Sequence, residues 1–211
     1  ELCRLTGCAL HICHISTARG AELVRAAKAE GLPVTAEVCP HHLFLDEALL
    51  DETYNTNLKM NPPLRTPADT AALREGICDG TLDCVVTDHA PHALHEKECE
   101  FEIAPFGVVG LETSLPLMLT NLVSTGKMSW QRLVEVMCVN PRKVARLEAV
   151  KVEAGSPADL TLIDPTIELE VTPELFCGKQ HNSAFMGAKL TGRATDTVVA
   201  GKHVLKNCKL A

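Results

Sequence analysis

Long runs of a single residue type are missing from this 211-residue sequence. No cluster of Lys and Arg exceeds two or three residues and the formal net charge is −7, which argues against nucleic acid as a partner. No apolar stretch reaches the roughly 18 residues that a membrane-spanning helix needs, so we expect no membrane partner either. With 46% hydrophobic and 22% charged residues, the composition is that of an ordinary globular domain.

Cysteine pairs with the C-x-x-C spacing are also missing, although the chain contains ten cysteines. Most of them, including Cys13, Cys84 and Cys138, lie in apolar segments. We therefore expect buried, reduced thiols and a cytoplasmic protein, with a zinc finger or a disulfide framework as the less favoured alternative. The N-terminal stretch ELCRLTGCALHICH has neither the basic start nor the uninterrupted apolar run of a signal peptide. Because it also lacks an initiator Met, we expect a fragment of a longer chain.

Apolar strands and amphipathic helices alternate over the first two thirds of the chain. Strands are predicted at 9–16, 32–40 and 82–92. Helices are predicted at 17–31, with Ser16 or Thr17 as cap and Gly31 as stop, and at 66–80, with Thr66 as cap and Pro67 first. Further helices are expected at 110–126, 129–140 and 141–147, the last two capped by Ser129 and Asn140.

This alternation indicates a parallel sheet or a β/α barrel, and the long loops after the strands are where barrels place their chemistry. The pattern changes near residue 150. The segments ADLTLIDP, IELEVTP and DTVVAGKHVLKN read as short alternating strands separated by turns, which predicts a small antiparallel unit. We therefore divide the chain into a barrel part, 1–150, and a small β domain, 151–211.

Polar side chains end all three predicted strands. His11 and His14 are three residues apart, so on a regular strand they would face opposite sides, and only one could face a barrel interior. His41 and His42 end the second strand, and Asp88 ends the third. Taken singly, each has an ordinary structural explanation: a hydrogen-bonded core histidine, a structural histidine pair, and a helix cap or Asx turn.

Taken together, the three strand ends favour a functional site. Parallel strands deliver their carboxyl ends to one rim of the sheet, and each strand here brings an imidazole or a carboxylate. These groups are the ligands that borderline divalent metals prefer. A carboxylate beside such a metal can also accept a proton from water. From the spacing alone, a metal-dependent hydrolase is the favoured function.

Six strings carry a resemblance to a known family: HICHIST, TAEVCPHHLFL, KMNPPLR, TDHAPH, APFGVVGLET and NPRKV. In this order they resemble the class I, bacterial-type dihydroorotases of the amidohydrolase superfamily, and the likeness extends over essentially the whole chain. TDHAPH is shared with hydantoinases and allantoinases, whereas PHHL with MNPPLR is more particular to dihydroorotases. The resemblance implies an α/β fold, a zinc-dependent TIM-like β/α barrel of which this chain supplies the last three strands, followed by a small β-sandwich segment.

The resemblance also implies roles for individual residues. His14 matches a zinc ligand, and Asp88 matches the aspartate that binds metal and transfers the proton. Asn61 and His92 match residues that contact the substrate, and Phe106 and Gly107 match a loop whose backbone meets it. Glu37 lies in a motif whose acid touches metal in some relatives, and we do not assign it as a ligand.

The implied reaction is the interconversion of N-carbamoyl-L-aspartate and dihydroorotate, with one or two zinc ions per complete site. The family's H-x-H pair, bridging carboxylate, further histidine and substrate-binding arginine are not found here, so we expect the chain alone to be inactive. The alternatives are another cyclic amidohydrolase, such as a hydantoinase or allantoinase, or a non-catalytic scaffold subunit for aspartate transcarbamoylase. A homodimer or an association with that enzyme are the expected partnerships.

Overall fold

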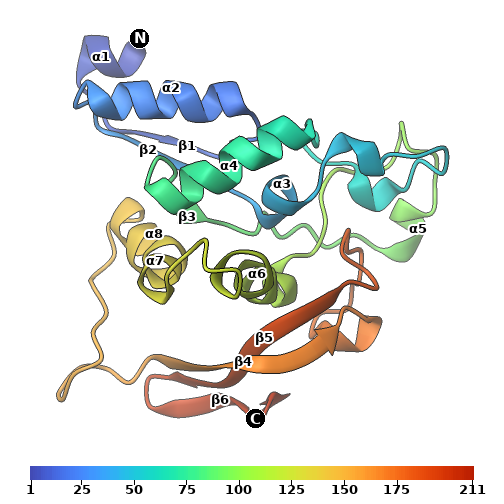
Figure 1. Cartoon of the computed structure of the whole chain (residues 1–211). Helices are drawn as coiled ribbons and strands as arrows, with labels where there is room; N and C mark the ends of the chain where they lie inside the picture. Colours follow the sequence, from blue (N-terminus) through green and yellow to red (C-terminus); the bar gives the residue numbers. More distant parts are fainter.

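A three-stranded parallel sheet forms the centre of the N-terminal part in the computed structural model, which describes residues 1–211. The strands β1 (Leu10–Ile12), β2 (Val34–Val38) and β3 (Cys84–Val85) lie in the order β1-β2-β3, and both pairs are parallel. Helices α2 (Ala18–Ala29) and α4 (Pro67–Asp79) cover one face, and the helices that follow residue 110 lie on the other (Figure 1). This alternation confirms the predicted β/α arrangement.

The strands are shorter than predicted, whereas the helix caps agree with the sequence. The Thr17 side chain accepts a hydrogen bond from Gly20 N, and Thr66 forms a capping box with Asp69, with Pro67 in the first turn. A capped first turn fixes where each helix begins, because it satisfies backbone N–H groups that would otherwise lack partners. The chain therefore leaves each short strand and enters each helix at a defined residue.

The helical layer below the parallel sheet differs from the prediction at one cap. Helix α6 (Leu111–Met118) continues as a π-helical turn, η3 (Leu119–Val123), and Ser129 caps α7 (Trp130–Val134) as expected. Asn140 is not a cap, because α7, the π-helical η4 (Glu135–Val139) and α8 (Asn140–Val144) run on without a break. The Asn140 side chain instead donates a hydrogen bond to the Asp83 carbonyl at the start of β3.

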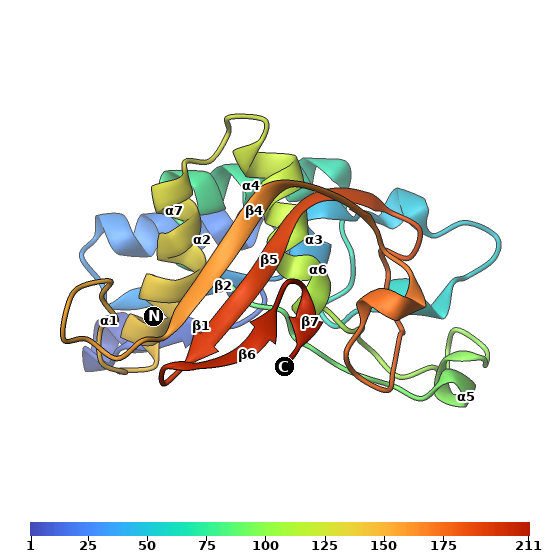
Figure 2. The ribbon, with the colours of Figure 1, turned by 90° about the horizontal axis from the view of Figure 1, so that it is seen from below.

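A four-stranded antiparallel sheet packs beneath α6 and η3, on the side away from the parallel sheet (Figures 1 and 2). Its order is β4 (Leu160–Glu170), β5 (Lys189–Val199), β6 (Lys202–Lys206) and β7 (Lys209–Leu210). The first two predicted strands are in fact one, because β4 continues through an irregularity between Asp164 and Glu168. The expected antiparallel unit is confirmed, and the sandwich stays a prediction because residues 151–211 contain this one sheet.

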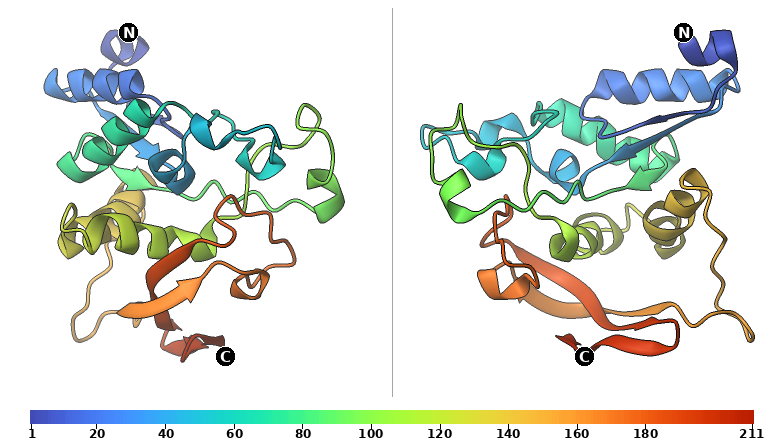
Figure 3. Two further views of the ribbon diagram at one scale, coloured as in Figure 1. Left: turned by 45° about the vertical axis from the view of Figure 1, so that its right-hand side comes forward. Right: turned by 180° about the vertical axis from the view of Figure 1, so that it is seen from behind.

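Two apolar clusters bind the layers together. The first lies between the parallel sheet and its helices and includes Val24, Val38, Leu73 and Val136. The second lies between α6, the loops and the antiparallel sheet and includes Leu117 and Val171. In two further views, one turned by 45° and one from behind, the long loops that follow β2 and β3 extend together from one end of the molecule (Figure 3).

The remaining elements are short. They are the helices α1 (Leu2–Thr6), α3 (Pro40–Phe44) and α5 (Leu94–Lys97), and the 3-10 turns η1 (Glu47–Leu49), η2 (Thr56–Leu58) and η5 (Pro173–Leu175). None of the helices has the length and apolarity needed to cross a membrane.

Candidate metal and substrate site

The structure brings together the two residues predicted to bind metal. His14 follows β1, Asp88 follows β3, and His14 Nε2 lies 3.7 Å from Asp88 Oδ1. Both residues have left-handed backbone conformations, with φ of 54° and 46°. Such values are uncommon for residues other than glycine and cost free energy that the surrounding fold must offset. The chain therefore leaves the regular strands in a conformation that aims an imidazole and a carboxylate at the same point.

Glu37 joins both predicted strand-end histidines. Its Oε1 lies 3.1 Å from His14 Nδ1, its Oε2 lies 2.9 Å from His11 Nε2, and its side chain is only 11% exposed. His11 Nδ1 also lies 2.8 Å from Thr35 Oγ1. The prediction that His11 and His14 face opposite sides is wrong, because β1 ends at Ile12 and strand alternation does not extend to His14. Glu37 thus orients two imidazoles, a role that no motif had indicated.

Two cysteines border this arrangement. Cys39 Sγ lies 3.4 Å from His14 Nδ1, and burial, followed by the nearby Asp88 and Glu37 carboxylates, raises the pKa of the Cys39 thiol. The Cys13 pKa is also raised, by partial burial and by Glu37. All ten cysteines are free, but the expectation that they are buried holds only for Cys3, Cys39 and Cys84. Four others are partly buried, and Cys8, Cys13 and Cys177 are exposed.

The predicted substrate loops also come together. His92 Nε2 lies 2.9 Å from the Phe106 carbonyl oxygen, and Gly107 N donates to the Lys59 carbonyl at 2.9 Å. Gly107 has φ 94°, and a Cβ there would lie 2.7 Å from Ala90 Cβ. Only glycine fits this close approach without a shift of the backbone. The loop after β3 is therefore folded back on itself and fastened to the loop that carries KMNPPLR.

Asn61 and the Phe106 ring lie at the exposed surface of these loops. Phe106 is 52% exposed, and Lys59 Nζ lies 4.7 Å from its ring centroid. The Asn61 side chain is exposed and makes no hydrogen bond to His14 or Asp88. The structure thus links His92, Phe106 and Gly107 directly, and it places Asn61 on the adjoining loop.

Asn182 is a residue that sequence reasoning missed. Its side chain is 7% exposed; Oδ1 accepts from His92 N at 3.0 Å, and Nδ2 donates to the Ala90 carbonyl at 2.9 Å. Its own carbonyl accepts from Val109 N. Asn182 comes from the segment between β4 and β5, 90 residues from His92, and it belongs to none of the recognised strings. No local pattern could have indicated it, because its partners are backbone groups distant in the sequence.

Lys97 was missed for the same reason. Its ammonium group donates to the Thr56 and Pro105 carbonyls at 3.2 and 2.8 Å, and the residue is buried. Burial, followed by repulsion from Lys59, lowers the Lys97 pKa. The lysine therefore ties the loop after β2 to the loop after β3, away from His14 and Asp88.

The donor atoms around His14 and Asp88 suit a zinc-class ion. Zinc binds imidazole nitrogen and carboxylate oxygen at about 2.0–2.2 Å, so two ligands of one ion lie roughly 3–4 Å apart, as His14 Nε2 and Asp88 Oδ1 do. The second ring nitrogen of His14 meets Glu37, the carboxylate partner that ligating histidines usually have. The residues present therefore fit part of a catalytic zinc site, which needs about three protein ligands.

Known proteins resemble this chain in sequence. The dihydroorotase of Carboxydothermus hydrogenoformans is 49% identical over 203 residues, which cover 95% of this chain and 47% of that protein. The dihydroorotase of Pelotomaculum thermopropionicum is 46% identical over 203 residues, with coverages of 96% and 47%. The chain thus spans about half the length of the curated relatives it matches.

Solved structures of cyclic-amide hydrolases resemble it in fold. L-Hydantoinase (dihydropyrimidinase) from Arthrobacter aurescens superimposes with a TM-score of 0.92 at 34% identity, over 100% of this chain and 48% of that one. Dihydropyrimidinase from Brevibacillus agri gives 0.90 at 25% identity, with coverages of 100% and 47%. The fold is therefore a partial TIM-barrel-like one. Residues 4–204 match the model of the amidohydrolase family, and the chain belongs to this family.

Proposed function

We propose that this chain is the C-terminal part of a dihydroorotase, a hydrolase that interconverts N-carbamoyl-L-aspartate and (S)-dihydroorotate in pyrimidine biosynthesis. The observation that carries the proposal is the 3.7 Å approach of His14 and Asp88 at the carboxyl ends of neighbouring strands. The names and identities of the sequence relatives support the choice of substrate. In this proposal the chain supplies barrel strands six, seven and eight and part of a β-sandwich.

His14 and Asp88 would hold zinc, with one or two ions in the complete site. Bound zinc supplies the Lewis acidity that lets water attack an amide carbonyl at neutral pH. Asp88 accepts the proton of the attacking water and delivers it to the departing ring nitrogen, and it acts in reverse during ring closure. Glu37 keeps the His14 ring oriented through its Nδ1 contact.

The substrate would bind against the joined loops. Asn61 and His92 hold the ring and carboxylate of dihydroorotate, and the backbone at Phe106 and Gly107 meets its amide edge. Because Asn182 fixes the His92 backbone and Lys59 fixes Gly107, these groups are held in place before the substrate arrives. Orientation of this kind can lower a barrier by several kcal/mol.

Asp88→Asn tests the proton transfer. In a version extended upstream to include the missing ligands, we expect a loss of roughly 10²–10⁴-fold in dihydroorotate hydrolysis, the usual contribution of a general acid-base group. Asn also tolerates the left-handed backbone, so the thermal unfolding midpoint should change little. Turnover within about tenfold of the unaltered enzyme would contradict this role of Asp88.

The same assay on the 211-residue chain tests the prediction that this chain alone is inactive. A catalytic zinc site has about three protein ligands, and His14 and Asp88 supply two of them. Bound metal is measured in parallel with and without His14→Ala. If the chain alone hydrolysed dihydroorotate at the rate of the extended version, the requirement for upstream ligands would be wrong.

Hydantoin hydrolysis is the second candidate function, favoured by the 34% identity and close superposition with L-hydantoinase. The extended enzyme should turn over dihydroorotate far faster than hydantoin or dihydrouracil, because the latter two lack the carboxylate that Asn61 and His92 are proposed to hold. The opposite preference would favour the hydantoinase function.

The proposal also includes a cytoplasmic location and either a homodimer or an association with aspartate transcarbamoylase. Chromatography of the chain with and without that enzyme tests the partnership.

A further inference from the structure

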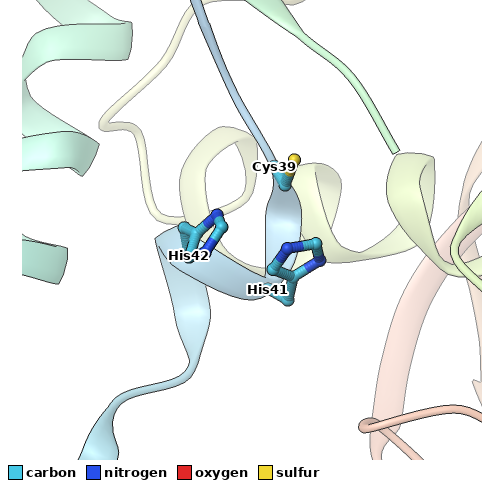
Figure 4. Close-up of side chains that lie close together, drawn as sticks. All are labelled: Cys39, His41 and His42. Atoms are coloured by element: carbon cyan, nitrogen blue, oxygen red, sulfur yellow. The ribbon is translucent and has the colours of Figure 1, made fainter. Parts of the chain in front are cut away.

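A second group of side chains of the types that bind metals lies next to His14 and Asp88. Cys39 ends the β2 segment, and His41 and His42 lie on the short helix α3 that begins directly after it (Figure 4). All three residues are buried, and each can offer a ligand atom within 4.8 Å of the others. None of them has a role in the proposed dihydroorotase reaction.

The hydrogen bonding of His42 is the kind that metal-ligating histidines have. Its Nε2 lies 2.8 Å from the Pro62 carbonyl oxygen, so this nitrogen carries the proton and donates it. In the neutral ring Nδ1 is then an acceptor, and it has no hydrogen-bond partner although the residue is only 2% exposed. A buried acceptor without a partner is costly. Ligating histidines commonly donate their other N–H to a backbone carbonyl in this way.

His41 and Cys39 complete the set. The His41 and His42 rings are edge to face, with centroids 4.3 Å apart. Cys39 supplies sulfur, the soft donor that distinguishes this group from the nitrogen and oxygen donors at His14 and Asp88. A thiolate with two imidazoles matches the ligands of Zn²⁺ and the chemically similar Cd²⁺, and it is poorly suited to Mg²⁺ or Ca²⁺.

We propose that Cys39, His41 and His42 bind a thiophilic divalent cation of the zinc group. The ion binds the Cys39 sulfur as the thiol proton passes to solvent, and one imidazole nitrogen from each histidine occupies a further position. Because Cys39 Sγ now contacts His14 Nδ1 at 3.4 Å, binding withdraws the sulfur from His14. The site is thus a neighbour of the predicted catalytic metal, with separate protein ligands.

Titration of the 211-residue chain with Cd²⁺ tests the proposal, because cadmium bound to thiolate absorbs in the ultraviolet whereas cadmium bound to nitrogen and oxygen does not. We expect the absorbance to appear in the unaltered chain and in His14→Ala. Because all ten cysteines are free, the readout is the absorbance of the first equivalent of Cd²⁺ bound. Cys39→Ser should remove the absorbance of that equivalent, and His41→Gln should weaken Cd²⁺ binding by more than about tenfold. Cys84→Ser, which alters another buried thiol, is the matched control and should leave the titration unchanged.

The other outcomes contradict the proposal. If no thiolate absorbance appears, or if Cys39→Ser retains the absorbance of the first Cd²⁺ equivalent, Cys39 does not bind the cation. If Cys13→Ser removes the absorbance instead, the sulfur ligand belongs to the group of His11, Cys13 and Glu37. Circular dichroism of each variant confirms that it is folded. Because the readout is metal binding and not turnover, its failure would leave the proposed dihydroorotase function untouched.

Discussion

The two sheets of this molecule use their strands differently. The parallel strands β1 and β3 contain three and two residues, and the chain leaves them early to place His14 and Asp88 with left-handed backbones. The antiparallel strands β4 and β5 contain 11 residues each and pair along most of their length, with register shifts after Leu162 and between Asp164 and Glu168. The parallel strands are thus short, and the site residues follow directly after them. The antiparallel sheet instead packs against α6.

This difference predicts where substitutions affect stability and where they affect function. Strain at His14 and Asp88 persists because the surrounding layers hold it, as is common at functional sites. In the antiparallel sheet, β5 packs against α6 and η3. Substitutions there should lower stability, and substitutions around the joined loops should lower activity more than stability.

Gly192→Ala should have the largest effect on stability. Gly192 lies in β5 with φ 89°, and a Cβ there would lie 2.5 Å from Leu119 Cδ1 and 3.3 Å from Pro165 Cα. Overpacking and the left-handed backbone together should cost roughly 3 kcal/mol of unfolding free energy, measured by urea denaturation. Gly31→Ala is the matched control, because Gly31 has φ 75° with nothing within 4 Å, and it should cost only about 1 kcal/mol. Equal losses would show that the packing of β5 under η3 contributes little.

Asn182→Ala should lower stability less than Gly192→Ala does, and it should lower activity more. The change leaves His92 N and the Ala90 carbonyl without their partner and should cost about 2 kcal/mol. In the extended enzyme, we expect KM for dihydroorotate to rise, because the loop that carries His92 loses its support. Asn121→Ala is the control, since Asn121 donates only to the Leu117 carbonyl in its own helix. An unchanged KM would show that Asn182 does not position the loop that carries His92.

Asp69→Asn should have the smallest effect, and one that depends on pH. The Ala18 N–H, followed by the Thr66 hydroxyl, lowers the pKa of Asp69 below its ordinary value of 3.8. The folded state therefore favours the ionised form, and this stabilisation is present above the unfolded pKa and lost as pH falls through the lower folded pKa. We expect a loss of about 1 kcal/mol at neutral pH that diminishes as the pH falls below about 4 and disappears below the folded pKa, measured by thermal unfolding. A difference that persisted in acid would contradict this origin.

The sequence predicted features that depend on neighbouring residues. Thr17, Thr66 and Ser129 are correct caps because a capping hydrogen bond spans only a few residues. Asn140 is not a cap, because its side chain binds the distant Asp83 carbonyl and the helix continues. The strand ends were overestimated because apolar residues such as Val86 read as strand beyond the point where the ladder ends.

The site was predictable in part for the same reason. His14 and Asp88 could be paired because parallel strands share a rim, and the structure confirms their proximity. The shared contact of His11 and His14 with Glu37 could not be predicted, because it depends on where β1 ends. Asn182 and Lys97 bind backbone carbonyls, which carry no residue identity and so leave no pattern in the sequence.

Lys97 has a mechanical consequence for the loops. Its ammonium group reaches Thr56 and Pro105, and Thr56 Oγ1 returns a hydrogen bond to the Lys97 carbonyl. Segments separated by about 40 residues are therefore cross-linked without a covalent bond. A displacement of one segment is therefore transmitted to the other, and the two should move together. We expect the Gly107 amide, which donates to the Lys59 carbonyl, to exchange its hydrogen only when both segments move apart from each other.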